Sequence, residues 1–370
     1  MRFKEFNTAW IHSKIGEICE IEMCKRIFSN QTNTIGGVPF YKIGTIGGKP
    51  DTWISENLFN EYKDKYNYPK KGEILITCSG TVGKCIIFNG KDAYFQDSNI
   101  VWLANKSTVL DIFLFYIMNN IDWSYLNSTT ITRIYGSDLR NLNFYYPNNK
   151  NEQQKITDFL SLLDQRIDTQ SKIIEDLECQ INYIRHKLFT GYINDDINSQ
   201  KYIFNKIFIS YKKLNEQSLQ QYTIGKNGIK SMSNHLNYSI NSHIVFMPNT
   251  LILGIGIDEI GVSIDTTGCC SPIYKTYTIN NEIVDTLFLN IFANDYFSMI
   301  KNRVTQKSTR REFEFDYKEL AKTLFTLPDI EIQKKDAQIV NKFYFKLQKE
   351  KDILELYKKQ KAYLLKNMFI

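Results

Sequence analysis

The segment ILITCSGTVGKC, residues 74–85, is the first place where the sequence suggests chemistry, because a Gly-Lys pair there follows a Ser-Gly-Thr turn. A phosphate-binding loop needs a glycine, four residues and then Gly-Lys-Ser/Thr, so that backbone N–H groups surround the phosphate and a hydroxyl reaches magnesium. Gly83 and Lys84 fit, but Cys78 replaces the first glycine and Cys85 replaces the hydroxyl. A matching segment, PNTLILGIGIDEIGVSID, has glycines without the Gly-Lys pair. The pattern therefore predicts a turn between two strands.

Two further segments approach enzymatic motifs without completing them. SPIY, residues 271–274, has Ile273 where an amino-methyltransferase has a second proline, and the Gly-Ile-Gly at 254–256 lies too close to serve as its cofactor turn. PDIEIQK, residues 328–334, has the carboxylates of a metal-dependent nuclease, but Gln333 stands where that site has lysine. Its acidic residues, Asp329 and Glu331, suit the start of a helix. Both segments are therefore interpreted as structural, and a free-standing DNA methyltransferase or nuclease is kept as an alternative.

Metal, secretory and membrane functions are not expected. The seven cysteines show no Cys-x-x-Cys spacing, and the four histidines form no His-x-x-x-His pair, which favours reduced thiols and no metal site. The opening residues contain no apolar signal-like core, and no window approaches 18 apolar residues. These features predict a cytoplasmic protein that does not contact a membrane.

Basic and hydroxyl side chains gather in two turns. The segment KNRVTQKSTRR, residues 301–311, carries five basic residues and no acidic one, and NSTTITR, residues 127–133, has a similar place in the first half. Such side chains suit phosphates and base edges, although ordinary surface polarity is the alternative for each. The predicted DNA-binding residues are Ser79, Thr81, Lys84, Thr129, Thr130, Arg133, Lys307, Thr309, Arg310 and Arg311.

Two long helices are predicted in one shared register. From residue 156 apolar residues recur at alternating spacings of four and three, and the same register returns about 180 residues later. A polar break at Gln170 recurs as Glu350, and Pro147 and Pro328 precede the two helices. The predicted seam of a helix pair consists of Leu160, Leu163, Ile167, Gln170, Ile174, Leu177, Val340, Phe343, Leu347, Glu350, Leu354 and Tyr357.

The predicted fold class is α+β, with two β-rich globular domains and an antiparallel coiled coil, related by an internal repeat. We expect the first domain over residues 1–150, a helix over 151–190, the second domain over 191–328 and a second helix over 329–370. Packing of each helix on its own domain is the alternative to a helix pair. A seam of about 33 residues spans about 50 Å, or one and a half turns of DNA. Such a spacer suits two DNA half-sites, or two protein partners of a scaffold.

Motifs along nearly the whole chain resemble those of the specificity subunits of type I DNA restriction–modification systems. They are WIHSKIGEI, GGVPFYKIGTIGG, KKGEILITCSGTVGKC and SDLRNLNFYYPNNKNEQQKITDFLSLLDQRI in the first half, and YTIGKNGIKSM and GCCSPIYKTY in the second. The second helix departs from the pattern, because IEIQKKDAQI replaces NEQQKI and places Asp336 and Lys361 on the seam.

The resemblance implies a non-catalytic role. Two target recognition domains would read the halves of a bipartite, asymmetric site in double-stranded DNA, while the helices set their spacing. The helices would also bind two methyltransferase subunits, and restriction/translocase subunits would join them. The chain would bind no cofactor, because S-adenosylmethionine, ATP and Mg would be used by those partners.

Overall fold

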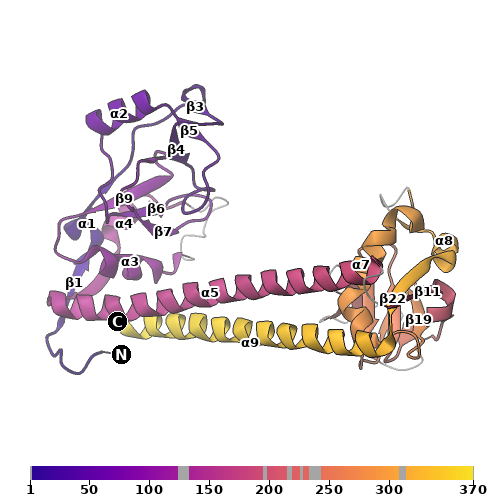
Figure 1. Cartoon of the computed structure of the whole chain (residues 1–370). Helices are drawn as coiled ribbons and strands as arrows, with labels where there is room; N and C mark the ends of the chain where they lie inside the picture. The colour runs from indigo at the N-terminus through magenta and orange to yellow at the C-terminus, as the bar shows by residue number, and fades with distance from the viewer. Residues whose placement is uncertain are drawn as a thin grey trace. The chain divides into compact units, whose positions relative to one another are not determined.

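The computed structural model describes residues 2–123, 133–194, 198–214, 219–225, 228–232, 243–307 and 314–369 (Figure 1). The chain divides into two compact units, Met1–Gln170 with Ile353–Ile370, and Ser171–Asp352. The two long helices, α5 (Lys150–Ile193) and α9 (Ile330–Met368), each contribute residues to both units. These helices are the ones predicted over 151–190 and 329–370.

The first unit is built from a strand pair and two four-stranded sheets. Strand β1 (Trp10–Lys14) pairs antiparallel with β10 (Asn143–Pro147). One sheet has the order β2 (Cys19–Glu22), β9 (Ile100–Asn105), β6 (Ile74–Thr77) and β7 (Cys85–Ile87). The other has the order β3 (Thr32–Asn33), β5 (Trp53–Ile54), β4 (Val38–Tyr41) and β8 (Tyr94–Phe95). The helices are α1 (Ile15–Ile18), η1 (Ser29–Gln31), α2 (Glu56–Lys65), α3 (Asp111–Asn119) and α4 (Gly136–Asn141).

The second unit repeats this plan. Strand β11 (Ser199–Ile203) pairs antiparallel with β22 (Leu324–Pro328). One sheet has the order β12 (Phe208–Tyr211), β19 (Lys275–Ile279), β16 (Thr250–Leu253) and β17 (Ile260–Ser263). The other has the order β14 (Gly228–Ser231), β13 (Gln221–Gly225), β18 (Gly268–Cys270) and β15 (Ile244–Phe246). The remaining elements are α6 (Phe204–Ile207), α7 (Thr286–Val304), β20 (Thr305–Gln306), β21 (Glu314–Phe315) and α8 (Tyr317–Lys322).

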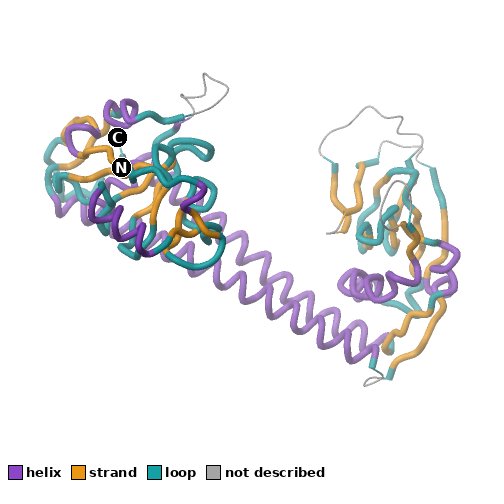
Figure 2. Tube along the Cα trace, turned by 90° about the horizontal axis from the view of Figure 1, so that it is seen from above, coloured by secondary structure: helices purple, strands orange, loops and turns teal. Residues whose placement is uncertain are grey.

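The internal repeat extends to the connection between strands and helices. In each unit a short helix leads into the first strand of the first sheet, and the second sheet contains one parallel pair, β4 with β8 or β13 with β18. Figure 2 shows strands and helices mixed in both units, as the α+β fold class predicts. The predicted repeat is therefore confirmed in helix position and in the strand order of the first sheet, whereas the second sheets of the two units differ in strand order.

A buried glutamine fixes the start of each long helix. Gln153, which is fully buried, accepts a hydrogen bond from Leu110 N at 2.8 Å and donates one to Pro147 O at 2.8 Å. Gln333 is its counterpart, accepting from Asp285 N at 3.0 Å and donating to Pro328 O at 2.8 Å. Each side chain satisfies backbone groups at a strand end and at the start of α3 or α7. The glutamine found in place of a nuclease lysine is thus structural.

Within the first unit, the start of α5 packs against the end of α9. Leu160 and Leu163 share a core with Leu364 and Met368, and this core also includes residues of α3. On the same seam Lys361 Nζ lies 2.5 Å from a carboxylate oxygen of Asp164. The other Asp164 oxygen accepts a hydrogen bond from Tyr116 OH at 2.8 Å. The lysine that departs from the family pattern therefore has a partner on the opposite helix.

Within the second unit, the end of α5 packs against the start of α9. Lys351 pairs with Glu178 at 2.7 Å, Arg185 donates to Tyr344 OH at 3.3 Å, and Tyr192 OH donates to Asp336 Oδ2 at 2.7 Å. The partner's number falls as the α5 number rises, so the helices run antiparallel (Figure 1). Asp336, the other departure, is satisfied by a buried tyrosine.

The predicted seam residues lie on the less exposed side of each helix. Every one is buried or half-buried, and the exposed positions of both helices fall between them. The helices also pack on the globular parts, since Ile184, Leu188 and Val340 contact the core that includes α7. Within each unit the two helices therefore pack on each other and also on the globular part. Both arrangements occur together because the apolar face of each helix is wide enough for both contacts.

Candidate nucleic-acid interface

The loop between β6 and β7 carries three of the predicted site residues, Ser79, Thr81 and Lys84. The four residues of β6 are buried, and the chain then turns through Gly80 (φ 67°) and Gly83 (φ 79°), which adopt left-handed backbone conformations. A Cβ atom at Gly83 would lie 2.2 Å from the Trp123 ring, so glycine is required there. The turn leads into a strand and not into a helix, which is why it has no helix N-terminus to hold a phosphate.

Arg133 lies beside this loop, although more than fifty residues separate it from Ser79 in sequence. An isolated antiparallel bridge joins Ser79 to Arg133, and Ile134 N donates to Cys78 O at 2.8 Å. Ser79 Oγ is hydrogen-bonded to Asn99 Oδ1 at 2.8 Å. The structure therefore brings two predicted residues together, with Asn99 holding the serine hydroxyl.

Lys84 connects the β6–β7 loop to the turn after β4. Its exposed side chain donates from Nζ to Ile46 O at 2.5 Å. A Cβ atom at Gly80 would lie 2.9 Å from Ile43 Cδ1, so the two turns are in close contact. In the same turn Lys42 pairs with Asp51 at 3.1 Å. The candidate surface in the first unit thus includes residues 42–51, which sequence reasoning treated only as a landmark.

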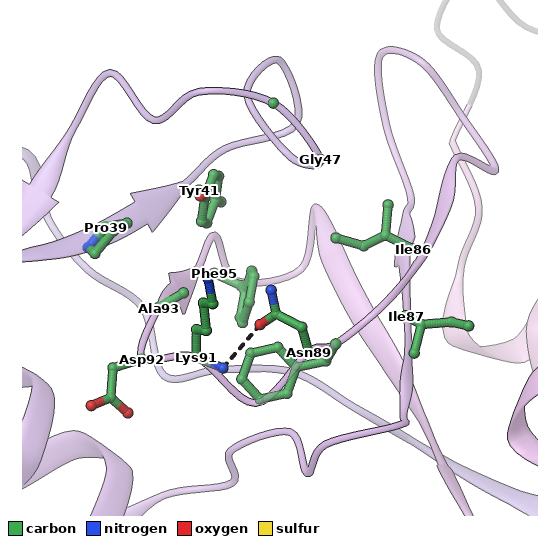
Figure 3. A pocket seen from close by; sticks show the side chains of 12 residues that line it. Pro39, Tyr41, Gly47, Ile86, Ile87, Asn89, Lys91, Asp92, Ala93 and Phe95 are labelled. Atoms are coloured by element: carbon green, nitrogen blue, oxygen red, sulfur yellow. Dashed lines mark hydrogen bonds between the residues drawn. The ribbon is translucent and has the colours of Figure 1, made fainter. Parts of the chain in front are cut away.

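A pocket of about 440 Å³ opens beside this turn (Figure 3). Its walls include Gly47 and the stacked rings of Tyr41 and Phe95, whose centroids are 6.0 Å apart. The lining carboxylate, Asp92, pairs with Lys63 at 2.9 Å. The lining residues include no histidine, serine or cysteine.

The second unit has a bridge at the corresponding position, and Lys307 follows a strand next to it. An isolated bridge joins Gly256, in the β16–β17 loop, to Glu314, and Glu314 also pairs with Gln306, the residue before Lys307. The loop is closed by Glu259, whose carboxylate accepts from Ile255 N at 2.9 Å. The exposed Lys307 therefore follows a residue whose strand partner, Glu314, contacts the turn that corresponds to the Ser79 turn.

The other predicted contacts, Thr129, Thr130, Thr309, Arg310 and Arg311, lie outside the described residues. Sequence reasoning missed Asn99 and its neighbours, residues 97–98. Their signal was present in part, since Asp-Ser-Asn is a turn-forming tripeptide. The side chains that bind to this turn could not be predicted from the sequence, because they come from distant parts of the chain.

The loop cysteines are not poised for catalysis. Burial raises the pKa of Cys78 to about 11 and that of Cys85 to about 12, so both thiols stay protonated near neutral pH. Among the described residues no group of histidine, cysteine, aspartate and glutamate side chains is placed to hold a metal ion. No helix in the described part of the chain is long and apolar enough to cross a membrane.

Comparisons with known proteins agree with this architecture. Residues 7–179 match the family model described as the type I restriction modification DNA specificity domain. A putative type I restriction enzyme specificity subunit of Haemophilus influenzae is 46% identical over 169 residues, which are 45% of this chain and 43% of that protein. The aligned part thus spans less than half of that relative.

Two solved structures share the fold over almost the full length. The type I restriction–modification S subunit from M. genitalium is 19% identical, covers 100% of this chain and 99% of its own, and has a TM-score of 0.60. A chain from a structure on complex assembly and conformational transition of the type I R-M system is 11% identical, with 97% of each chain covered and a TM-score of 0.58. Residues 7–179 therefore resemble the type I restriction modification DNA specificity domain. The chain as a whole shares the fold of the type I restriction–modification S subunit from M. genitalium.

Proposed function

We propose that the chain is the DNA-reading subunit of a type I restriction–modification complex, with each unit reading one half of a bipartite, asymmetric site. One observation carries this proposal. In both units the loop after the third strand of the first sheet, β6 or β16, forms a β-bridge to the segment before α4 or α8, and the side chains at the bridge differ between the units. The first unit presents Ser79 with Arg133, and the second presents Gly256 with Glu314 beside Lys307. Equivalent frames with unlike contacts suit two unlike half-sites.

In this proposal residues 1–150 and 191–328 are the target recognition domains, and α5 and α9 set their spacing. The two helices also dock the methyltransferase subunits, through apolar side chains that remain exposed beside the seam. Those side chains are Leu162, Ile173, Tyr183, Ile339, Phe345, Ile353, Leu356 and Tyr363, which are 36–67% exposed. Large apolar side chains at this density on one helix pair favour a protein partner.

Catalysis in this proposal belongs to the partners. The methyltransferase subunits bind S-adenosylmethionine and methylate adenine, and restriction subunits use ATP and Mg for translocation and cleavage. The chain itself binds no cofactor and works in the cytoplasm. Its contribution is to choose the site.

The test is to co-express the chain with its cognate methyltransferase subunits and map methylated adenines in the host DNA. We expect a two-part motif that disappears when the chain is deleted. Binding of the complex to a duplex carrying that motif should weaken steeply with salt, because phosphate contacts release counterions. Methylation or cleavage by the purified chain alone would favour the free-standing enzyme, and an absence of DNA binding would favour the protein scaffold.

A further inference from the structure

The turn between β8 and β9 holds an unusual backbone conformation. Ser98 has φ 51°, in the left-handed region that residues other than glycine seldom adopt, and Asn99 N approaches Asp97 O at 2.5 Å. This conformation is kept by its surroundings, since Cys78 N donates to Asn99 O at 2.8 Å and Ile100 N donates to Gln96 O at 3.0 Å. Backbone strain of this kind is common where a turn must place side chains for binding.

Residues 97–99 each hold a side chain from a different part of the first unit. Asp97 accepts from Arg26 Nε at 2.8 Å. The carbonyl of Ser98 accepts from a terminal nitrogen of Arg133 at 3.2 Å, and Asn99 is hydrogen-bonded to Ser79 Oγ at 2.8 Å. Two arginines and a serine, from three separate segments, are therefore gathered by three consecutive residues.

Arg26 combines a fixed position with access to a ligand. Its side chain is 60% exposed, whereas that of Asp97 is only 17% exposed. The ion pair is made through Nε, so this hydrogen bond does not use the two terminal nitrogens. A guanidinium held in this way loses less conformational freedom on binding than a free one. It can also donate two hydrogen bonds to one guanine, at O6 and N7.

We propose that Arg26 contacts DNA, reading guanine in the half-site of the first unit, and that Asp97 and Asn99 are positioning residues for Arg26 and Ser79. This inference rests on the proposed function, and it adds Arg26 as a base-contacting residue and guanine as the base that Arg26 reads. Arg26 and Arg133 form one reading cluster, because both are held by the same strained turn.

The test compares variants of the full chain in complex with its methyltransferase subunits. Arg26→Ala should lower the affinity of the complex for a duplex that carries the mapped motif by about 10- to 100-fold. It should also abolish discrimination between guanine and the other bases at one position. Arg26→Lys should keep part of the affinity but lose the discrimination, because lysine cannot form the two-bond contact. Asp97→Asn keeps the shape but removes the ion pair, and should reduce affinity by about 3- to 10-fold with the same loss at that guanine.

Glu20→Gln is the matched control. Glu20 pairs with Lys106 at 2.7 Å at the opposite end of β9, so this variant removes the charge of an exposed ion pair in the same unit. It should bind within about twofold of wild type. The melting temperature of each complex shows whether the variant folds. If Arg26→Ala does not fold, Asp97→Asn and Arg26→Lys decide the question.

Three results would overturn the inference while leaving the proposed function intact. They are unchanged binding by Arg26→Ala, equal weakening on all DNA sequences, and equal effects of Asp97→Asn and Glu20→Gln. Equal weakening on all sequences would assign Arg26 to the phosphate backbone. A wild-type complex that binds no duplex would instead overturn the proposed function.

Discussion

Replacing Gln153 by leucine tests whether the buried glutamines hold the long helices to their units. Leucine keeps a similar volume, but it leaves Leu110 N–H and Pro147 C=O, which Gln153 satisfies, without their partner. Each buried group left unpaired costs about 1–3 kcal/mol, and the added apolar contact offsets part of this. We therefore expect Gln153→Leu to reduce the free energy of unfolding of the first unit by about 2–4 kcal/mol.

The assay must separate the two units, because a chain with two compact units need not unfold in one transition. Calorimetry should show one transition lowered by about 4–16 °C, taking about 2–4 °C per kcal/mol for a unit of this size. Hydrogen exchange should accelerate at the start of α3 and leave α7 unchanged. Gln333→Leu should produce the converse pattern, because Gln333 binds the backbone at the start of α7.

Gln154→Leu is the control for this prediction. Gln154 is the next residue in the same helix, is exposed, and bonds to Asp158 across one turn at 2.7 Å. It should change stability by less than about 0.5 kcal/mol. If Gln153→Leu and Gln154→Leu lowered the transition temperature of the first unit equally, the buried glutamine would not be a structural link.

Two smaller predictions concern an ion pair between the long helices and the reactivity of the thiols. Lys361→Met should cost about 1 kcal/mol or less, because Lys361 and Asp164 are 26% and 37% exposed and water screens their pair; a loss above about 3 kcal/mol in a denaturant titration would contradict this. Cys179 is exposed while burial raises the pKa of Cys24 to about 12, so a thiol reagent at about pH 8 should modify Cys179 quickly and the buried thiols only after unfolding. Fast modification of Cys24 in the native chain would argue against its burial.

The long helices could be predicted because a repeat of three and four residues reports directly on one buried face. The positions of Asp336 and Lys361 on the seam could be predicted, but their hydrogen-bond partners could not, because those partners come from the other helix. The strand order followed from the repeat only in outline, as each sheet joins segments far apart in sequence. The turn at Ser98 was missed, because a left-handed serine depends on the contacts around it.

Under the proposed function, the two bridge positions would let one arrangement of strands serve two unlike recognition tasks. Arg133 and Glu314 are equivalent in the fold, yet they carry opposite charges. An arginine favours phosphate and the acceptor edge of guanine, whereas a glutamate repels phosphate and accepts from the amino group of cytosine. Under the proposed function, attraction for the DNA backbone in the second unit would come from neighbours such as Lys307. The strands could then stay alike in both units, because the loops that they support would carry the difference in recognition.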